Sequence, residues 1–341
     1  MSIRIVKKGY LDTIQDLGRF GYQHLGIPPG GALDPWALQL ANGLVGNTPG
    51  EAGLELFFPA PTIQFETDAV IAISGADWQP CLTGIPVDIN RTIIVKKGVT
   101  LTFQQPNTGR VAYLTVRGGF QLEPWLGSCS TQWGVELSGF KGRALQKEDQ
   151  LPFRRSFEFS NLTPESFRSL PWKPALKTSS INNAIRIIPD AHFHFLDDSS
   201  REILTSASFN ILPQSNRMGF FFKGPQLSGN YRELISAAVR KGTVQWLSDK
   251  NFIILMADHP TTGGYPRIAQ VIAADVPKLA QWPASLPLQF KWISRSDAEM
   301  IYREQHFLLS QMQIAASNRL ASYLKISQAS NGKDCINNNC F

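Results

Sequence analysis

Short apolar stretches, each bounded by glycine, proline or asparagine, recur through most of the chain. In the first half these stretches are Thr62–Phe65, Ala69–Ser74, Thr92–Lys96, Thr100–Phe103 and Val111–Val116. Their length and their β-branched residues are typical of strands. Their close spacing favours a sandwich or barrel over alternating strands and helices. The pattern therefore predicts a mainly β protein with some α-helix.

The strand pattern stops once in the middle of the chain and then resumes. Residues 160–183 are rich in serine and proline and show no periodicity, which indicates a connecting segment. Strand-like stretches return at Ile185–Ile188 and end at Phe290–Ile293. Because the chain is also longer than one typical domain, we expect two β-rich halves in tandem, residues 1–159 and 184–294.

Two segments carry helical signals instead. Asp34-Pro35 suits the N-cap and first position of a helix, and Gly46-Asn47 suits its end. In the last region, residues 295–341, Ser296–Glu299 is a capping-box pattern, and apolar residues then recur at helical spacing. We expect a long amphipathic helix there, packed on the body of the protein or on a partner. A polar, mobile tail is expected from Gln328.

The composition is that of an ordinary globular protein and argues against several classes of function. The 341 residues carry a net charge of +6, but the basic residues are scattered, so nucleic-acid binding is not expected. No apolar run approaches the roughly 20 residues that span a bilayer, and the N-terminus lacks a secretory signal pattern. Cys335 and Cys340 have no second ligand pair nearby, so no metal site is predicted. A reduced, cytoplasmic setting without membrane contact is the expectation.

Two glycine-rich loops contain most of the polar residues that could carry chemistry. The first is Thr13–Gly31, whose candidate residues include Asp16, Arg19 and Tyr22. An Asp–Arg pair in such a loop can serve a binding site, or it can simply hold the loop in place. The sequence leaves both interpretations open.

The second loop follows the apolar run Phe252–Met256. It begins with Asp258 and continues with Thr262, Gly263, Gly264 and Tyr265. Paired glycines allow positive φ angles and leave amide N–H groups uncovered, which suits close approach to a ligand or another chain. An ordinary hairpin with a glycine turn fits the same pattern.

Several familiar catalytic patterns are absent from the sequence. There is no GxxxxGK[ST] phosphate loop, and no GxGxxG follows a strand. Neither a GxSxG nucleophile elbow nor an HExxH zinc helix occurs. The residues alone therefore indicate a two-part β-rich protein with polar, glycine-flanked loops, and they do not identify a reaction.

A set of ordered segments does resemble one known family. The segments are TIQDLGRFGYQHLGIPPGGALDPWALQLANGLVGN, LGSCST, GRALQKEDQLPF, SNRMGFFFKGPQL and LMADHPTTGGYPRIAQVIAAD. Together they are similar to the allophanate hydrolase subunit 2 family, which includes the C-type subunit of 5-oxoprolinase and related biotin-dependent carboxyltransferases. The similarity spans about residues 5–290, so only the C-terminal helix and tail lie outside it.

The resemblance implies a fold built from cyclophilin-like β-barrel parts and a cytoplasmic subunit that works with two partners. One partner would be a sister carboxyltransferase-like subunit, of the B type. The other would be a lactam-utilisation subunit, of the A type. Together they would open 5-oxo-L-proline to L-glutamate in an ATP-dependent hydrolysis of a cyclic amide, with this chain inactive alone. ATP would bind with or through the partners, because the chain has no phosphate loop.

The resemblance also implies a site in the matching segments. A substrate carboxylate needs cationic or amide N–H partners, which Arg19, Arg217 and the Gly263-Gly264 turn could supply. Asp16 and Asp258 would be the catalytic residues and would orient these groups or move a proton. The other implied substrate-binding residues are Tyr22, Ser128, Thr262 and Tyr265.

Two other functions stay open under the same resemblance. One is the carboxyltransferase subunit of a urea carboxylase, with biotin as cofactor and a urea-like substrate. The other is a non-catalytic regulator, similar to the antagonist of a kinase inhibitor. Cys129 and Ala237-Ala238 depart from the family pattern, which would remove a guanidinium and a carboxylate. The loop Leu247–Asn251 also replaces a Pro-Pro-Asp-Gly-like turn.

Overall fold

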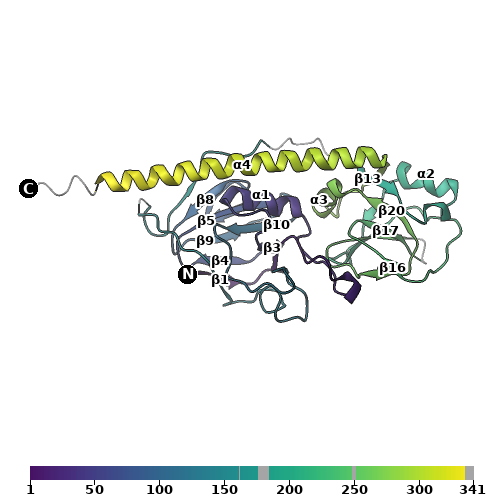
Figure 1. Ribbon diagram of the computed structural model, residues 1–341, viewed down its shortest axis with the longest axis horizontal. Helices are drawn as coiled ribbons and strands as arrows, with labels where there is room; N and C mark the ends of the chain where they lie inside the picture. Colours follow the sequence, from purple (N-terminus) through teal and green to yellow (C-terminus); the bar gives the residue numbers. More distant parts are fainter. Residues whose placement is uncertain (161, 176–183, 248–250, 335–341) are drawn as a thin grey trace, which may run out of the picture.

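A computed structural model describes residues 1–334 except 161, 176–183 and 248–250, with side chains of the last helix described as far as residue 325. Two β-rich halves lie side by side along the long axis of the molecule, and one helix, α4 (Arg295–Asp334), crosses both (Figure 1). The expectation of a mainly β protein with two tandem halves and a C-terminal helix is confirmed.

The N-terminal half contains two antiparallel sheets of six strands each. The first has the order β11 (Gln150–Pro152), β1 (Ser2–Lys7), β4 (Thr62–Phe65), β9 (Thr100–Phe103), β6 (Pro80–Leu82), β7 (Ile85–Pro86). The second has the order β12 (Phe167–Ser169), β8 (Thr92–Val95), β5 (Ala69–Asp77), β10 (Thr108–Val116), β3 (Gly53–Phe57), β2 (Thr13–Gln15). One buried cluster takes Ile3 and Ile63 from the first sheet and Leu54 and Ile71 from the second.

Strand β12 lies inside the segment 160–183, which the sequence predicted as a connection. It pairs antiparallel with β8, so the second sheet of the N-terminal half includes residues beyond 159. The strand has three residues and two of them are exposed, so it leaves no alternation that a pattern search could find.

Helix α1 (Pro35–Val45) has the ends that the sequence predicted. The Asp34 carboxylate accepts a hydrogen bond of 2.9 Å from the Ala37 amide, and Gly46 closes the helix with a φ of 71°. Its apolar face packs with residues of β5 and β8 in a third buried cluster, which also takes Leu309 and Leu320 from α4. Helix α1 is therefore enclosed between the second sheet and α4.

The C-terminal half is built on a seven-stranded sheet. Its order is β14 (Asn210–Ile211), β15 (Gly219–Lys223), β18 (Phe252–Leu255), β17 (Thr243–Trp246), β20 (Arg267–Val271), β13 (Ala184–Pro189), β21 (Gln289–Trp292). Only β13 and β21 run parallel among these described strands. A two-stranded sheet joins β16 (Ala237–Ala238) to β19 (Thr262–Gly263). The helices of this half are α2 (Asp198–Ser206), α3 (Val276–Ala280), η2 (Phe193–Phe195) and η3 (Ala273–Asp275).

The two halves share one hydrophobic core. Leu38 and Tyr113 of the N-terminal half lie in the same buried cluster as Val276 and Leu279 of the C-terminal half. Gln281 adds polar contacts across this joint, because its Nε2 donates to the Asp34 carboxylate and to the Val111 carbonyl at 2.8 Å each. The relative position of the halves is therefore set by packing and hydrogen bonds together.

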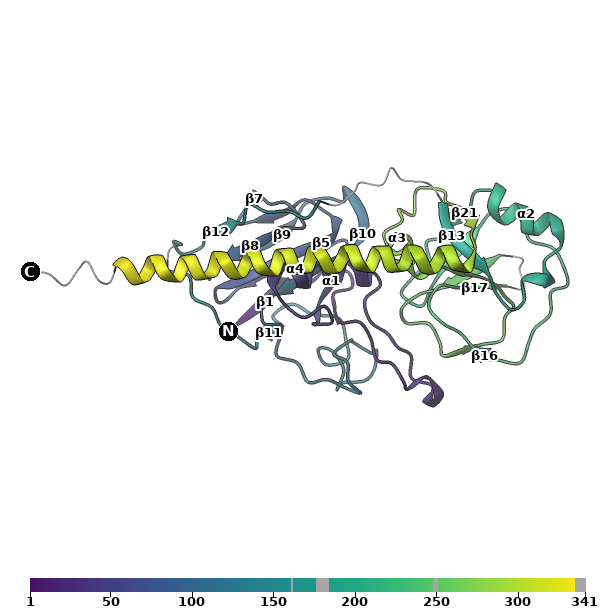
Figure 2. The same cartoon turned by 45° about the horizontal axis from the view of Figure 1, so that its top comes forward.

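Helix α4 packs on the body of the protein, one of the two arrangements that the sequence allowed (Figure 2). It continues through residues 328–334, where the sequence predicted a mobile tail. The tail cysteines Cys335 and Cys340 lie outside the described residues. None of the helices in the described ranges is long and apolar enough to cross a membrane.

Candidate functional site

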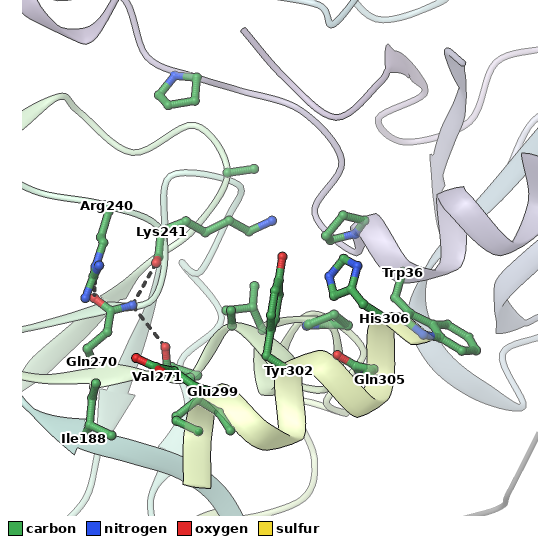
Figure 3. A pocket seen from close by; sticks show the side chains of 18 of the residues that line it. Trp36, Ile188, Arg240, Lys241, Gln270, Val271, Glu299, Tyr302, Gln305 and His306 are labelled. Carbon is green, nitrogen blue, oxygen red and sulfur yellow. Dashed lines mark hydrogen bonds between the residues drawn. The ribbon is translucent and has the colours of Figure 1, made fainter. Parts of the chain in front are cut away.

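A cleft of about 1140 Å³ lies where the two halves and the first turns of α4 meet. The N-terminal half contributes residues of its first loop, between Leu17 and Ala32, and the first turns of α1, and the C-terminal half contributes β13, β20 and the turn before β17. Figure 3 shows the side chains of Lys241, Tyr302 and His306 pointing into the same space. The cleft is slightly larger than the roughly 300–1,000 Å³ of ordinary small-molecule sites.

Lys241 is one of several cationic residues that line the cleft, together with Arg240, Arg295 and Arg303. Its Nζ donates to the carbonyl oxygens of Ala32 and Leu33, at 2.9 Å each, so it also links the two halves. An ammonium has three N–H groups, and in the described part of the chain the third has no partner. Burial, and after it the nearby Arg217, lower the pKa of Lys241 to about 8, against the opposite effect of the carboxylates of Glu55, Asp34 and Asp258.

The backbone beside Lys241 is held by the buried Gln270. The Gln270 amide donates to the carbonyl oxygens of Lys241 and Val271, and its oxygen accepts from Arg240 (Figure 3). His259 lines the same wall and is 2% exposed, and burial lowers its pKa. The imidazole is therefore neutral near pH 7 and adds no positive charge to the cleft.

A buried ion network lies behind the cleft, with Arg217 at its centre. The Arg217 guanidinium binds both oxygens of Asp258 at 2.8 Å and also binds Glu55 and the Gly31 carbonyl. Burial lowers the pKa of Arg217, but the carboxylates of Asp258 and Glu55 outweigh it and raise the pKa. Glu55 in turn accepts hydrogen bonds from the Tyr113 hydroxyl and the Leu33 amide. Each of these side chains therefore has hydrogen-bond partners inside the protein.

The position of Arg217 differs from the expectation that it binds a substrate carboxylate. It is 4% exposed, and each of its three nitrogens already has a protein partner. Glu55 comes from β3 of the N-terminal half, whereas Asp258 follows β18 of the C-terminal half. Arg217 therefore bridges the two halves.

Asp16 also holds parts of the protein together, through hydrogen bonds to its own loop and to residues 128–130. Its carboxylate accepts hydrogen bonds from the amides of Gly18 and Cys129 and from the hydroxyls of Ser128 and Ser130. It is 8% exposed, and both of its oxygens accept hydrogen bonds from the protein. Asp16 and Ser128, predicted as catalytic and substrate-binding residues, instead tie the loop Thr13–Gly31 to the segment LGSCST. This arrangement matches the alternative interpretation in which polar residues hold the loop in place.

The glycine turn of the second predicted loop, residues 262–265, does not line the cleft, although His259 of the same loop does. Thr262 and Gly263 form strand β19, and Tyr265 is 41% exposed. Neither Gly263 nor Gly264 has the positive φ that the sequence suggested. Both glycines are needed for space instead: a Cβ would lie 2.4 Å from Gln245 Nε2 at Gly263 and 2.9 Å from the Leu234 carbonyl oxygen at Gly264. The paired glycines therefore serve the packing of β19 on its neighbours.

None of the ten predicted site residues lines the cleft directly. Arg19 and Asp258 lie next to Gly30, which does line it. Tyr22 precedes the short helix η1 (Gln23–Leu25), which projects from the side of the molecule opposite α4 (Figure 1). Sequence reasoning missed Lys241, Gly30 and the α4 residues, because a single lysine, glycine or helical tyrosine carries no local signal.

The structure shows the surroundings of two of the three departures from the family pattern and of part of the third. Cys129 is half-buried, and burial together with the neighbouring Asp16 raises the pKa of its thiol to about 11, so it is not a thiolate near pH 7. Ala237 and Ala238 form β16, where both are exposed. The replaced turn at 247–251 lies partly outside the described residues. No group of three His, Cys, Asp or Glu side chains able to hold a metal occurs within the described ranges.

Comparisons with known proteins point to one family. Residues 25–292 match the family model described as carboxyltransferase domain, subdomain A and B. The chain is 35% identical to the C-type subunit of 5-oxoprolinase from Escherichia coli K12, over 91% of this chain and 97% of that protein. It is 33% identical to the corresponding 5-oxoprolinase subunit from Haemophilus influenzae, over 88% of this chain and 94% of that protein. The solved structure of Kluyveromyces lactis urea carboxylase matches 91% of this chain, with a TM-score of 0.82 and 26% identity, but this match covers only 29% of that larger protein.

Proposed function

We propose that this chain, which belongs to the carboxyltransferase domain family with subdomains A and B, is one component of an ATP-dependent 5-oxoprolinase that converts 5-oxo-L-proline to L-glutamate. The observation that carries the proposal is the identity of 35% and 33% to two proteins named as C-type subunits of 5-oxoprolinase, over nearly their whole length. The proposal includes two partner subunits, one carboxyltransferase-like and of the B type, one of the lactam-utilisation family and of the A type. It also includes a cytoplasmic setting.

The chemistry of the cleft suits a small cyclic amide that carries a carboxylate. Lys241 presents a charged N–H at the cleft bottom, and Tyr302 and His306 enter from α4. A charge-assisted hydrogen bond from the ammonium to a carboxylate is about twice as strong as one between neutral groups. The apolar part of the ring would pack on Trp36, Val239 and Ile272, which also line the cleft.

The ring amide of 5-oxo-L-proline is unreactive toward water, so ATP would supply its activation. The chain has no phosphate loop, and we assign ATP binding to a site made with or by the partners. Asp258 binds Arg217 through both of its carboxylate oxygens, and its role would be to orient charged groups. Loops from both halves and α4 converge on the cleft, so a partner that covers them would exclude water during the reaction.

We expect the purified chain alone to show no ATP hydrolysis that depends on 5-oxo-L-proline, and activity to appear when both partner proteins are added. The surface supports a need for partners, because Phe20, which precedes η1, and Leu25, which is its last residue, are exposed at 68% and 63%. The measurement is the rate of L-glutamate and phosphate formation by the chain alone, in each pair, and in the complete mixture. Turnover by the isolated chain would contradict the need for partners. A complete mixture that stays inactive would favour the regulator or the carboxyltransferase.

A second candidate is the carboxyltransferase subunit of a biotin-dependent urea carboxylase. The fold match to Kluyveromyces lactis urea carboxylase supports this alternative, at a TM-score of 0.82. Biotin would be the cofactor only under this alternative. The discriminating assay supplies free carboxybiotin and urea to the chain with and without its partners. Carboxylation of urea in the absence of 5-oxo-L-proline turnover would favour it.

Binding of a carboxylate substrate is expected to weaken as the pH rises above about 8. Burial lowers the pKa of Lys241 to about 8, so the ammonium loses its proton, and its charge, in that range. Below that pH the lysine is protonated and binding is constant; above it KM should rise by up to tenfold per pH unit.

In Lys241→Met, KM should be about 10- to 100-fold higher near pH 7, from the 1.5–3 kcal/mol of a charged hydrogen bond. Its KM should no longer depend on pH in this range.

The control for this prediction is Lys291→Met, which removes an exposed lysine of the same half. It should keep both the KM and the pH dependence of the original protein. If KM of the original protein stays flat between about pH 7 and 9.5 in the active mixture, a range that brackets the loss of the lysine proton, Lys241 does not bind the substrate carboxylate.

A further inference from the structure

A second hollow, of about 450 Å³, lies in the N-terminal half beyond the end of α1, and we call it the arginine hollow. The residues that line it come from four places along the chain: 46–48 after α1, Glu51 before β3, 117 and 118 after β10, and Arg154, Arg155 and Phe157 after β11. The cleft described above takes Trp36 and Gln39 from the first turns of the same helix. Because the 11 residues of α1 span about 16 Å, the arginine hollow is a separate site.

The arginine hollow contains more positive than negative charge. Three arginines line it, Arg117, Arg154 and Arg155, against one carboxylate, that of Glu51. Arg154 pairs with Glu51, and its Nε donates to the Gly118 carbonyl at 3.1 Å. Within the described ranges, neither Arg117 nor Arg155 has a carboxylate partner. Two positive charges of the hollow are therefore not neutralised by the protein.

Arg117 is held in place and still has donors to spare. Its Nη1 donates to the Val45 carbonyl at 2.9 Å, and its Cζ lies 5.6 Å from the centroid of the Phe157 ring. Arg117 is half-buried, but its Nε and Nη2, which make no hydrogen bond in the described part of the chain, are not enclosed by the protein. These two nitrogens can therefore donate to a ligand in the hollow.

Arg155 lies close to Arg117 and has an unpaired guanidinium. It is exposed, and in the part of the chain that the structure describes it forms no hydrogen bond or ion pair. Its aliphatic stem packs on Gly118, where an added Cβ would lie 2.9 Å from Arg155 Cβ and 3.1 Å from its Cγ and Cδ. Burial, and after it the charge of Arg155, lower the pKa of Arg117. Two like charges thus repel each other here, and an anion between them would remove this repulsion.

The backbone around the hollow leaves room for these side chains. Gly46 ends α1 with a φ of 71°, and a Cβ there would lie 2.6 Å from Arg117 Nη1. Gly118 has a φ of +81°, and its amide donates to Asn47 Oδ1 at 2.8 Å. The side-chain amide of Asn47 in turn donates to the Val116 carbonyl at 2.8 Å. The hollow therefore exists before a ligand binds, so binding does not have to order the backbone.

We propose that the arginine hollow is a binding site for a small dianion of the phosphate class, held by the guanidiniums of Arg117 and Arg155. A phosphate group carries about −1.5 to −2 charges at pH 7, which matches the two charges that the protein leaves unpaired. A carboxylate carries only one negative charge. The planar guanidinium also presents parallel N–H groups in a geometry that fits phosphate oxygens.

Two groups near the hollow oppose an anion, and both are already paired. The C-terminal end of α1 carries a partial negative charge, but the Val45 carbonyl there accepts a hydrogen bond from Arg117. The Glu51 carboxylate is paired with Arg154. The hollow therefore remains positive. It shares no lining residue with the cleft, so this proposal does not depend on the proposed function.

The test is equilibrium dialysis of the full chain against labelled inorganic phosphate, in a chloride buffer of constant ionic strength. We expect saturable binding in the millimolar range or tighter. Arg155→Met should weaken this binding by about tenfold or more, because it removes hydrogen bonds between charged groups. Its melting temperature should not change, since Arg155 has no partner in the described part of the chain. The control is Lys147→Met, which removes an exposed lysine of the same half and should stay within about twofold of the original affinity.

Competition with methyl phosphate and acetate identifies the class and source of the anion. Displacement by methyl phosphate would show that the hollow accepts the phosphate group of a larger molecule, and failure of methyl phosphate to compete would show that it takes the free ion; both support the proposal. Displacement by acetate as strong as that by inorganic phosphate would overturn the assignment to a dianion. The proposal would also be overturned by unchanged affinity in Arg155→Met, by a loss in Lys241→Met instead, which would place the anion in the cleft, or by no saturable binding at all.

A second variant tests Arg117 separately. Arg117→Lys keeps a positive charge near the Val45 carbonyl but loses the planar group whose Nε and Nη2 are unpaired in the described structure. We expect its phosphate affinity to fall by about tenfold or more. A folded Arg117→Lys protein with the original phosphate affinity would show that Arg117 only closes the end of α1, and would remove it from the proposed site.

Discussion

Arg217→Met is expected to lower the free energy of unfolding by about 3–5 kcal/mol, the range for removing one partner of a buried ion pair. The change leaves Glu55 fully buried without its cation and leaves Asp258 without the group that binds both its oxygens. Because these carboxylates come from different halves, the joint between the halves should weaken as well. The measurement is urea denaturation of the purified chain, followed by tryptophan fluorescence.

Two further variants separate the loss of the ion pairs of Arg217 with Glu55 and Asp258 from other effects of the substitution. Arg295→Met removes an arginine that is 85% exposed and pairs with Glu299 on the surface, and it should change stability by no more than about 1 kcal/mol. Adding Glu55→Gln to Arg217→Met should recover part of the loss, because it removes the unpaired buried charge. An Arg217→Met protein with normal stability but no activity would place Arg217 in the substrate site after all.

Asp16→Ala is expected to destabilise the protein by about 3 kcal/mol or more. The carboxylate accepts four hydrogen bonds, two from amides and two from hydroxyls, and hydrogen bonds to charged groups contribute about 1.5–3 kcal/mol each. Without it, these donors lose their common acceptor, and the loop Thr13–Gly31 loses the side-chain bonds from Asp16 to Ser128 and Ser130. Thermal unfolding, together with proteolysis of that loop, measures the effect.

The matched control is Asp198→Ala, which removes an aspartate that is 97% exposed on α2. It should change the free energy of unfolding by less than about 1 kcal/mol. Asp16 would regain a catalytic role if Asp16→Ala kept its melting temperature while kcat in the complete mixture fell by orders of magnitude.

The cleft is assembled from three parts of the chain that have little in common in sequence. Lys241 comes from the turn before β17, Gly30 from the first loop, and Tyr302 and His306 from α4. The two aromatic rings on α4 lie one helical turn apart, with centroids separated by 4.2 Å. The site therefore depends on how α4 lies across the halves, and α4 in turn packs closely because Gly43 of α1 leaves room for Gln313. A change at the contact between α1 and α4 would therefore also change the part of the cleft that α4 lines.

Local patterns in the sequence were enough for most elements of the fold. Strands β4 and β9 have the predicted boundaries, and α1 has the predicted cap and end. These features depend on residues within a few positions of one another: alternation along one strand, a carboxylate before a helix, a glycine after it. Strand β12 and the extended end of α4 were not predicted, because a three-residue strand and a polar helix leave no such local pattern.

The candidate site shows where local patterns stop being informative. The loops that the sequence singled out are indeed close to the cleft, and Arg19 and Asp258 lie behind its wall. Their roles, however, depend on partners far away along the chain: Arg217 lies 162 positions from Glu55 and 41 from Asp258. Lys241 binds carbonyl groups that lie 209 and 208 positions away.

By itself, the sequence determined the strands, the main helices and the polar loops, because these follow from interactions between near neighbours. Only the tertiary structure decided which polar groups already have hydrogen-bond partners inside the protein and which remain unpaired. Arg217 and Asp16 look as available in the sequence as Arg19 does, yet their donors and acceptors are filled by distant residues. The physical reason is that a buried charge is stabilised only by the groups that the fold brings within hydrogen-bond distance.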